Sequence, residues 1–303
     1  MKYFIGIDGG GTKTELVVVN ENGSVVAKKR VGSSNASDLG KERVIELLLE
    51  LVQSALPADT EQADVCMGLS GVGFSGCAGE IEVAIAAIPC VGKVRVYSDV
   101  QIALDSAYDG DGCIVIIGTG SVGYVRLDGE LHLVGGSGFM LDSSLSGYDL
   151  GREAINAVLS ATDGRGEQTL LTGIFEGLGE RDIRQTVRSV YAKGKAYVAS
   201  FAPTVFEAFD KGDKVAESIL RHCVSEWEKL LLGVWRTYGK EKCEVTLFGG
   251  VTKRWETIKR FLSAEMLAKI SFRVAEKPVV WGAVKGAASS VSEAFYAEFI
   301  RTY

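Results

Sequence analysis

The sequence predicts an α/β protein that contains an internal duplication. Near the N-terminus, the apolar runs Tyr3–Ile7 and Leu16–Val19 read as buried strands on either side of a glycine turn. The second half repeats the order: the apolar run Ile114–Ile117 leads into another glycine turn, a strand and an Asp128-Gly129 hairpin. Patterns typical of alternating helices and strands follow each copy, as expected for an α/β fold.

The first glycine turn has the residue types of a phosphate site. Consecutive glycines let the backbone approach a ligand closely, with N–H groups free to face an anion. Threonine hydroxyls and a lysine add donors and positive charge, and the preceding Asp8 can hold a hydrated Mg²⁺. The predicted phosphate-binding residues of this turn are Gly9, Gly10, Gly11, Thr12, Lys13 and Thr14. A P-loop is excluded because Thr12 separates Gly11 from Lys13 and a strand follows.

Two further glycine turns lie in the second half of the chain. The turn Gly118, Thr119, Gly120 and Ser121 matches the start of a dinucleotide fingerprint, but a hairpin follows it where that fingerprint requires a helix. The turn Gly249, Gly250 and Val251 ends an apolar strand and precedes a helical pattern. Its backbone can lie against a flat adenine or a ribose, although an ordinary strand-to-helix turn would have the same sequence.

The remaining elements follow from hydrophobic periodicity. We expect further strands at 64–69, 94–97, 244–248 and 270–274. We expect helices at 39–56, 79–88, 101–108, 151–160, 167–176, 180–193, 196–211, 213–238 and 255–268, and a final helix over 281–303.

Composition excludes several classes of protein. The 303 residues suffice for two domains, and a hydrophobic content of 47% suffices for two cores. The net charge of −6 and the lack of a basic cluster argue against nucleic-acid binding. No apolar run approaches 18 residues and the chain enters a strand at once, so we expect neither a membrane span nor a signal peptide. The six scattered cysteines fit reduced thiols in the cytoplasm.

Asp99 is the strongest catalytic candidate. It follows the strand 94–97 and precedes a helix, which places its carboxylate at the sheet edge where ligands of α/β proteins bind. The alternative is a structural role, because Ser98 or Asp99 would also cap the helix that begins near Val100. Both roles can coexist.

The three glycine turns, in this order, resemble the actin-like ATPase superfamily of sugar kinases, Hsp70 and actin. Within it the chain is most similar to the BadF/BadG/BcrA/BcrD ATPase and N-acetylglucosamine kinase branch. The resemblance implies two duplicated actin-like (ribonuclease H-like) domains with a nucleotide cleft between them. It places the first domain at 1–112, completed by a C-terminal helix at 285–303, and the second at 113–284. Further segments that carry the resemblance are Ser34-Asn35, Gly68–Gly71, Ser98-Asp99, Gly135–Phe139, Ser146–Tyr148, Gly151-Arg152 and Pro278–Val284.

The resemblance also implies an activity: an ATP-dependent kinase that phosphorylates a hydroxyl of an amino sugar, either N-acetylglucosamine or N-acetylmuramic acid or both. ATP and Mg²⁺ are the implied cofactors, a homodimer is compatible with the resemblance, and Asp99 is the implied general base. The Gly118–Ser121 turn would bind phosphates and the Gly249–Val251 turn adenosine, while Asp8 would hold Mg²⁺ through water. The implied sugar-binding residues are Asn35, Ser70, Asp99, Thr119 and Gly138.

One segment departs from the family pattern. The branch carries Gly-Gly-Trp-Gly followed by Gly-Asp-Glu-Gly-Ser-Gly-Tyr-Trp, whereas here Ser137 replaces the first tryptophan and Asp149 the last. The segment Asp142–Leu145 stands where Gly-Asp-Glu-Gly is expected, so Asp142 is the candidate for a substitute metal carboxylate. Loss of the tryptophan enlarges the expected acceptor pocket and favours a bulkier sugar such as N-acetylmuramic acid.

The altered segment keeps two other functions open. The chain could be a BadF-type ATPase that activates a partner enzyme, although those that transfer electrons need cysteines for an iron–sulfur cluster and no cysteine pair stands near the expected helix start. It could also be a nucleotide-binding regulator without catalysis. Retention of Asp99 favours the kinase.

Overall fold

The computed structural model describes residues 1–142, 144–180 and 182–303. The chain divides into two compact units. Unit 1 comprises Met1–Gly110 and Glu276–Tyr303, and unit 2 comprises Asp111–Ala275.

Unit 1 contains a five-stranded mixed sheet with the order β3-β2-β1-β4-β5. The strands are β1 (Lys2–Gly9), β2 (Thr14–Asn20), β3 (Val25–Val31), β4 (Gln62–Leu69) and β5 (Val91–Ser98). The first three strands are antiparallel neighbours, whereas β1, β4 and β5 run parallel. The carboxyl ends of β1, β4 and β5 therefore meet at one edge of the sheet.

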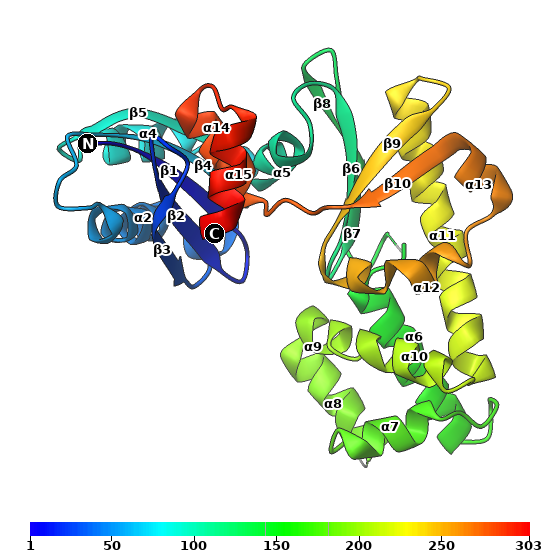
Figure 1. The fold of residues 1–303 in the computed structure, drawn as a ribbon. Coiled ribbons are helices and arrows are strands. Elements are labelled where there is room, and N and C mark those ends of the chain that lie inside the picture. The colour runs from blue at the N-terminus through cyan, green and yellow to red at the C-terminus, as the bar shows by residue number, and fades with distance from the viewer. Residues whose placement is uncertain (143, 181) are drawn as a thin grey trace. The chain divides into compact units, whose positions relative to one another are not determined.

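Helices cover both faces of this sheet. The first core lies between the sheet and helices α2 (Lys41–Ala55) and α4 (Ala78–Ala86). On the other face, α14 (Val280–Ala288) packs against β1, β4 and α5 (Asp99–Ala107), so the end of the chain completes the unit that its beginning forms (Figure 1). The unit also contains α1 (Ala36–Leu39), α3 (Val72–Ser75) and α15 (Glu293–Thr302).

The sheet of unit 2 repeats the topology of unit 1. Its strands are β6 (Gly112–Ile117), β7 (Ser121–Leu127), β8 (Glu130–Gly135), β9 (Cys243–Phe248) and β10 (Ile270–Val274), in the order β10-β9-β6-β7-β8. Here too three antiparallel strands are followed by two parallel ones. The duplicated α/β architecture that the sequence predicts is thus confirmed.

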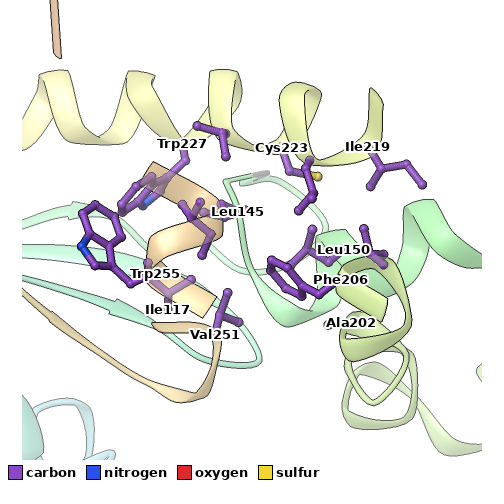
Figure 2. Close-up of a cluster of buried hydrophobic side chains, with 14 of the residues drawn as sticks. Ile117, Leu145, Leu150, Ala202, Phe206, Ile219, Cys223, Trp227, Val251 and Trp255 are labelled. Atoms are coloured by element: carbon purple, nitrogen blue, oxygen red, sulfur yellow. The ribbon is translucent and has the colours of Figure 1, made fainter. Parts of the chain in front are cut away.

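Unit 2 contains most of the helices. They are α6 (Gly147–Thr162), α7 (Leu171–Gly177), α8 (Ile183–Lys193), α9 (Lys195–Ala199), α10 (Ala202–Asp210), α11 (Lys214–Tyr238), the 3₁₀ helix η1 (Gly250–Arg254), α12 (Trp255–Lys259) and α13 (Ala264–Lys269). Figure 2 shows how their apolar side chains form one core: Trp227 of α11, Phe206 of α10 and Val251 of η1 belong to the same buried cluster.

Three predicted helices are interrupted. The helix expected over 255–268 ends at Lys259 and restarts at Ala264, where the Ser263 side chain accepts a hydrogen bond from the Met266 N–H. The final helix breaks at Ser289, whose φ of 64° is left-handed and ends α14, and Ser292 then caps α15. The helix expected over 196–211 divides into α9 and α10, with proline in the first turn of α10.

None of the helices formed by the described residues is both long enough and apolar enough to cross a bilayer.

Candidate functional site

In unit 1 the candidate polar residues gather where the three parallel strands end. Asp8 is the last residue but one of β1 and pairs with Gly68 of β4, and Leu69 of β4 pairs with Ser98 of β5. Asp8, Ser70 and Asp99 therefore follow or end three adjacent parallel strands. This edge is where ligands of α/β proteins bind, and the structure places there both of the carboxylates that the sequence singles out in this unit.

Backbone hydrogen bonds fix these loops to one another. The Ser70 N–H donates to the Gly9 carbonyl at 2.7 Å, and the Ser70 carbonyl accepts from the Ala36 N–H at 3.2 Å. The neighbouring Gly71 has a φ of +79°, and a Cβ there would lie 2.4 Å from Asn35 Oδ1. Glycine is therefore required for the close approach between the loop after β4 and the loop that carries Asn35.

Asn35 has both a structural contact and a position near the first glycine turn. Its Oδ1 accepts a hydrogen bond from the Ser37 N–H at 2.9 Å and so caps α1. Its Nδ2 lies 3.7 Å from the position that a Cβ on Gly11 would take. The amide thus lies beside the turn that the sequence assigns to phosphate, with its nitrogen toward that turn.

Both carboxylates have raised pKa values, and the charge of Asp99 contributes to the shift of Asp8. Burial raises the pKa of Asp8 from 3.8 to about 6, and the charge of Asp99 raises it further against the opposing effect of Lys13. Burial also raises the pKa of Asp99, although hydrogen bonds from the Val100 N–H and the Ser70 hydroxyl oppose the shift. A pair of half-buried carboxylates with raised pKa values is typical of a site that receives a cation or a proton.

The capping role proposed as an alternative for Asp99 belongs to Ser98. Its Oγ accepts from the Gln101 N–H, and the Gln101 side chain accepts from the Ser98 N–H, which makes a complete capping box. Asp99 is the first residue of α5, and its Oδ1 accepts from the adjacent Val100 N–H at 3.0 Å.

The first glycine turn is closed by a hydrogen bond from the Gly10 N–H to the Lys13 carbonyl, 2.9 Å long. Gly11, Thr12 and Lys13 are exposed. Thr14 differs, since it is fully buried and its hydroxyl contacts the Gly32 carbonyl and Ser34 Oγ at 2.9 and 2.8 Å. The Thr14 hydroxyl is thus occupied in holding the turn to the chain that follows β3.

In unit 2 the second glycine turn is held by the start of α6. The Gly147 N–H donates to the Gly118 carbonyl at 2.8 Å and the Tyr148 N–H to the Thr119 carbonyl at 3.0 Å. These helix N–H groups are therefore satisfied by the turn, while the positive end of the helix dipole still favours an anion nearby. Ser121 begins β7, and its Oγ is buried with no hydrogen-bond partner among the described residues.

The third glycine turn touches the second. Gly249 has a φ of +103°, and a Cβ there would lie 2.3 Å from the Ile117 carbonyl oxygen. Only glycine allows β9 to end this close to the end of β6. The Gly249 carbonyl accepts from the Thr252 hydroxyl at 2.7 Å, which starts η1.

The second and third turns line one cavity of about 610 Å³, which lies within unit 2. Its lining residues are Gly118, Thr119, Gly147, Ala199, Ala202, Pro203, Phe206, Gly250, Val251, Lys253 and Arg254. The wall formed by α9 and α10 is apolar, whereas the turns and η1 supply backbone groups and two cations. Phe206 and Val251 also belong to the buried core (Figure 2), so this wall is continuous with the packed interior. The cavity's size and lining suit a nucleoside.

Sequence reasoning assigned no ligand to seven of these lining residues: Gly147, Ala199, Ala202, Pro203, Phe206, Lys253 and Arg254. The two cations follow the Gly249–Val251 turn after one residue, Thr252, and this nearness to the turn is a signal for a binding role. Pro203 and Phe206 carry no such signal, because their approach to the turns depends on how α10 packs.

The segment that departs from the family pattern lies in unit 2. Gly138 is exposed with a φ of +96°, and its carbonyl accepts from the Asp142 N–H at 2.9 Å. The Asp142 carboxylate accepts from the Ser137 N–H at 3.3 Å. Ser143 lies outside the described residues. Neither Gly138 nor Asp142 lines the nucleoside-sized cavity.

Asp149 has a structural function. It is 2% exposed, and its Oδ2 accepts from the Ser144 and Ser146 N–H groups at 3.2 Å and from the Ser146 hydroxyl at 2.5 Å. With Ser146 it forms the capping box of α6, the helix that holds the second glycine turn.

The donor set fits Mg²⁺ bound in part by water and phosphate. No group of three or more His, Cys, Asp or Glu side chains suited to a metal occurs in residues 1–142, 144–180 and 182–303. Mg²⁺ in phosphoryl-transfer sites keeps several waters and takes only one or two protein carboxylates. Asp8, half-buried and close enough to Asp99 to feel its charge, meets that requirement.

Known proteins are similar to this chain in sequence and in fold. The sequence profile of the BadF/BadG/BcrA/BcrD ATPase family matches residues 5–289. A relative from Clostridium acetobutylicum, named N-acetylmuramic acid/N-acetylglucosamine kinase, is 35% identical over 235 residues, covering 75% of this chain and 77% of that protein. The N-acetyl-D-glucosamine kinase of Dictyostelium discoideum is 28% identical, covering 88% and 90%.

Solved structures of other proteins are similar to this chain in fold. A candidate N-acetylglucosamine kinase from Chromobacterium violaceum superposes with a TM-score of 0.73 at 26% identity, covering 94% of this chain and 98% of that one. The ROK-family glucokinase of Streptomyces griseus, solved with glucose and AMPPNP, has a TM-score of 0.61 at 17% identity and covers 95% and 99%, which supports the fold alone. The profile match over nearly the whole length, together with the clostridial relative, shows that this chain belongs to the BadF/BadG/BcrA/BcrD ATPase family.

Proposed function

We propose that the protein is an ATP-dependent kinase that transfers the γ-phosphoryl group to a hydroxyl of an amino sugar, with N-acetylglucosamine and N-acetylmuramic acid as acceptors. The observation that carries the proposal is the grouping of Asp8, Ser70 and Asp99 at the carboxyl ends of three parallel strands. The names of the clostridial and Dictyostelium relatives supply the acceptor class.

In this proposal Asp99 is the general base. Its carboxylate accepts the proton of the acceptor hydroxyl as the oxygen attacks phosphorus, a step that contributes about 10²–10⁴-fold when the base is well placed. The Ser70 hydroxyl, which lowers the pKa of this carboxylate, would help to orient it. Because Ser98 already caps α5, the Asp99 carboxylate is not needed for capping. Asn35 and Ser70 would bind sugar hydroxyls, along with Thr119 and Gly138.

The glycine turns would bind ATP. The backbone N–H groups of the exposed residues Gly11, Thr12 and Lys13, together with the Gly118–Ser121 turn, are proposed to hold the phosphates. The unit 2 cavity is proposed to hold adenosine against Gly250 and Val251. Mg²⁺, held by Asp8 through water, would offset the phosphate charge. Asp142 is a weaker candidate for that ion because its carboxylate already bonds within its own loop.

Serine at position 137 is proposed to leave room for a substituent larger than hydrogen at the sugar O3. The clostridial relative, whose name includes N-acetylmuramic acid, supports this acceptor. If the protein phosphorylates N-acetylglucosamine and rejects N-acetylmuramic acid entirely, this part of the proposal is wrong.

The test is sugar-dependent ADP release in a coupled assay with Mg-ATP. The panel comprises N-acetylglucosamine, N-acetylmuramic acid, glucosamine, N-acetylmannosamine, glucose and no sugar. We expect release with the first two sugars and a loss of at least about 10²-fold in Asp99→Asn. Glu50→Gln, which changes an exposed carboxylate on α2, is the control for a general effect of the substitution. Hydrolysis that does not depend on sugar would instead indicate the partner-activating ATPase.

The cysteines do not favour an electron-transferring activator. Cys66, Cys77, Cys113, Cys223 and Cys243 are buried, and Cys90 is half-buried in the loop before β5. Among the described residues they form no exposed cluster that could hold an iron–sulfur centre between subunits. All six cysteines are free thiols, which also supports our proposal of a cytoplasmic protein.

We also propose that the protein forms a homodimer, as the resemblance to the family allows. Light scattering would measure its mass in solution and so test this proposal.

A further inference from the structure

The unit 2 cavity is built from two segments that lie far apart in the sequence. One wall comes from α10 through Ala202, Pro203 and Phe206. The facing part comes from η1 through Gly250, Val251, Lys253 and Arg254. The width of the cavity therefore depends on how firmly η1 is held to α10.

An ion pair joins the two segments at the cavity rim. Arg254 Nη2 lies 2.7 Å from both Oδ1 and Oδ2 of Asp210, the last residue of α10. The Arg254 guanidinium also lies over the Phe206 ring, with its carbon 5.0 Å from the ring centre. Arg254 thus lines the cavity, whereas its ion-pair partner Asp210 does not. Arg254 Nη2 also donates to the Thr257 hydroxyl at 3.4 Å, a longer contact than the two to Asp210.

The neighbouring cation is held by no such contact. Lys253 is exposed, and within the described part of the chain its ammonium forms no hydrogen bond or ion pair. Asp210 therefore balances the charge of Arg254 and leaves that of Lys253 available to a phosphate. Of the two cations on the rim, Arg254 is held as part of the wall, whereas the Lys253 side chain can move to contact an anion.

We propose that Asp210 is a positioning residue for the nucleotide: it holds the Arg254 guanidinium over the Phe206 ring, so that the wall of the cavity is formed before the nucleotide base binds. The inference rests on the proposed function, in which this cavity receives adenosine. Without Asp210 the guanidinium has many rotamers, and ordering it on binding costs affinity. Without Asp210 the positive charge of Arg254 is no longer neutralised. This charge would not restore the lost affinity, because it would lie beside an uncharged base.

Loss of Asp210 should weaken nucleotide binding moderately and should have little effect on stability or turnover. The two side chains are 35% and 51% exposed, and exposed ion pairs contribute little to stability. Loss of Asp210 should therefore leave the unfolding temperature nearly unchanged while the Kd of the nucleotide rises about three- to fivefold, as expected for loss of preorganisation of one long side chain. The turnover number should stay within about twofold, since Asp210 is not proposed to act in the chemical step.

The test is direct binding of a fluorescent N-methylanthraniloyl ADP to the full chain, in parallel with ATP kinetics. The variants are Asp210→Asn, the conservative Asp210→Glu, Arg254→Ala and the double substitution of Asp210→Asn with Arg254→Ala. The matched control is Glu207→Gln, which breaks another exposed ion pair of α10, 2.7 Å long to Lys211, away from this cavity.

We expect Asp210→Asn to raise the Kd, Asp210→Glu to restore most of the affinity, and Glu207→Gln to change nothing. In the Arg254→Ala background, Asp210→Asn should add no further loss, because Asp210 acts through Arg254. Additive losses in the double variant, or an unchanged Kd in Asp210→Asn, would overturn the inference. Absence of nucleotide binding by the unaltered protein would instead count against the proposed function.

Discussion

Replacement of Asp8 by asparagine should make the ligand-free protein more stable near neutral pH. Burial and the charge of Asp99 raise the pKa of Asp8 from 3.8 to about 6. Above pH 6 the folded chain must hold this carboxylate ionised in a place that disfavours the charge. A shift of about two units corresponds to about 3 kcal/mol, which is the largest gain that Asp8→Asn can give.

The sign follows from proton linkage. Between pH 3.8 and about 6 the unfolded chain has already lost the proton that folded Asp8 still holds, so this residue's contribution to stability falls as pH rises through that window. Below pH 3.8 the carboxyl of Asp8 is protonated in both states, so its charge should not make the unfolding free energies of Asp8→Asn and the unaltered protein differ. Above the window the variant should be more stable by up to about 3 kcal/mol, with the difference constant from pH 7 upward.

Urea unfolding followed by circular dichroism, from pH 4.5 to 8, measures the difference in unfolding free energy between Asp8→Asn and the unaltered protein. Glu50→Gln, an exposed carboxylate of the same unit, serves as the control and should show no such pH-dependent gain. Added Mg-ATP should stabilise the unaltered protein and do so less in Asp8→Asn, because the bound cation would favour the ionised carboxylate. A variant that is equally stable or less stable at pH 8 would refute the assignment of a destabilised carboxylate at this position.

Three further outcomes are expected. Gly249→Ala should cost at least about 2 kcal/mol of unfolding free energy because of its φ of +103° and the contact with the Ile117 carbonyl, whereas Gly118→Ala, which meets no atom within 4 Å, should unfold normally and raise the KM for ATP. Ser98→Ala should lower the unfolding free energy by about 1 kcal/mol, since it removes the cap of α5. In kinetics, kcat/KM should decline at a higher pH than for a free aspartate as pH is lowered, because burial raises the pKa of Asp99 and a protonated carboxyl cannot accept a proton.

The parts of the site that sequence could predict are those set by short segments. Each glycine turn follows a strand directly, and Asp99 follows β5, so strand prediction alone placed them at a sheet edge. The duplicated hairpins were predictable for the same reason, since alternation and turn residues are local signals. The interrupted helices were not, because Ser263 and Ser289 end or restart a helix inside an otherwise continuous apolar pattern.

The parts that could not be predicted depend on packing between distant segments. Phe206 looks like any core aromatic, and only the packing of α10 brings it to the cavity beside η1. Asp149 stands in the sequence where the family has a tryptophan, whereas in the structure it caps α6 with Ser146. Thr14 had the right type for a phosphate contact, but its hydroxyl is buried against Ser34. In each case the residue type was informative and its surroundings decided the role.

The duplication produced two sheets with the same topology and different chemistry. The strands that occupy equivalent places are β1 and β6, β4 and β9, and β5 and β10. In unit 1 these strands lead into Asp8, Ser70 and Asp99, all of them polar side chains. In unit 2 the chain continues from β6 and β9 into Gly118 and Gly249, whose backbones approach closely and leave room for a nucleoside-sized cavity. The first sheet edge therefore carries the candidates for acid–base chemistry, while the second has a cavity of a size that suits a nucleoside. Phosphoryl transfer needs both a positioned acceptor and a bound nucleotide.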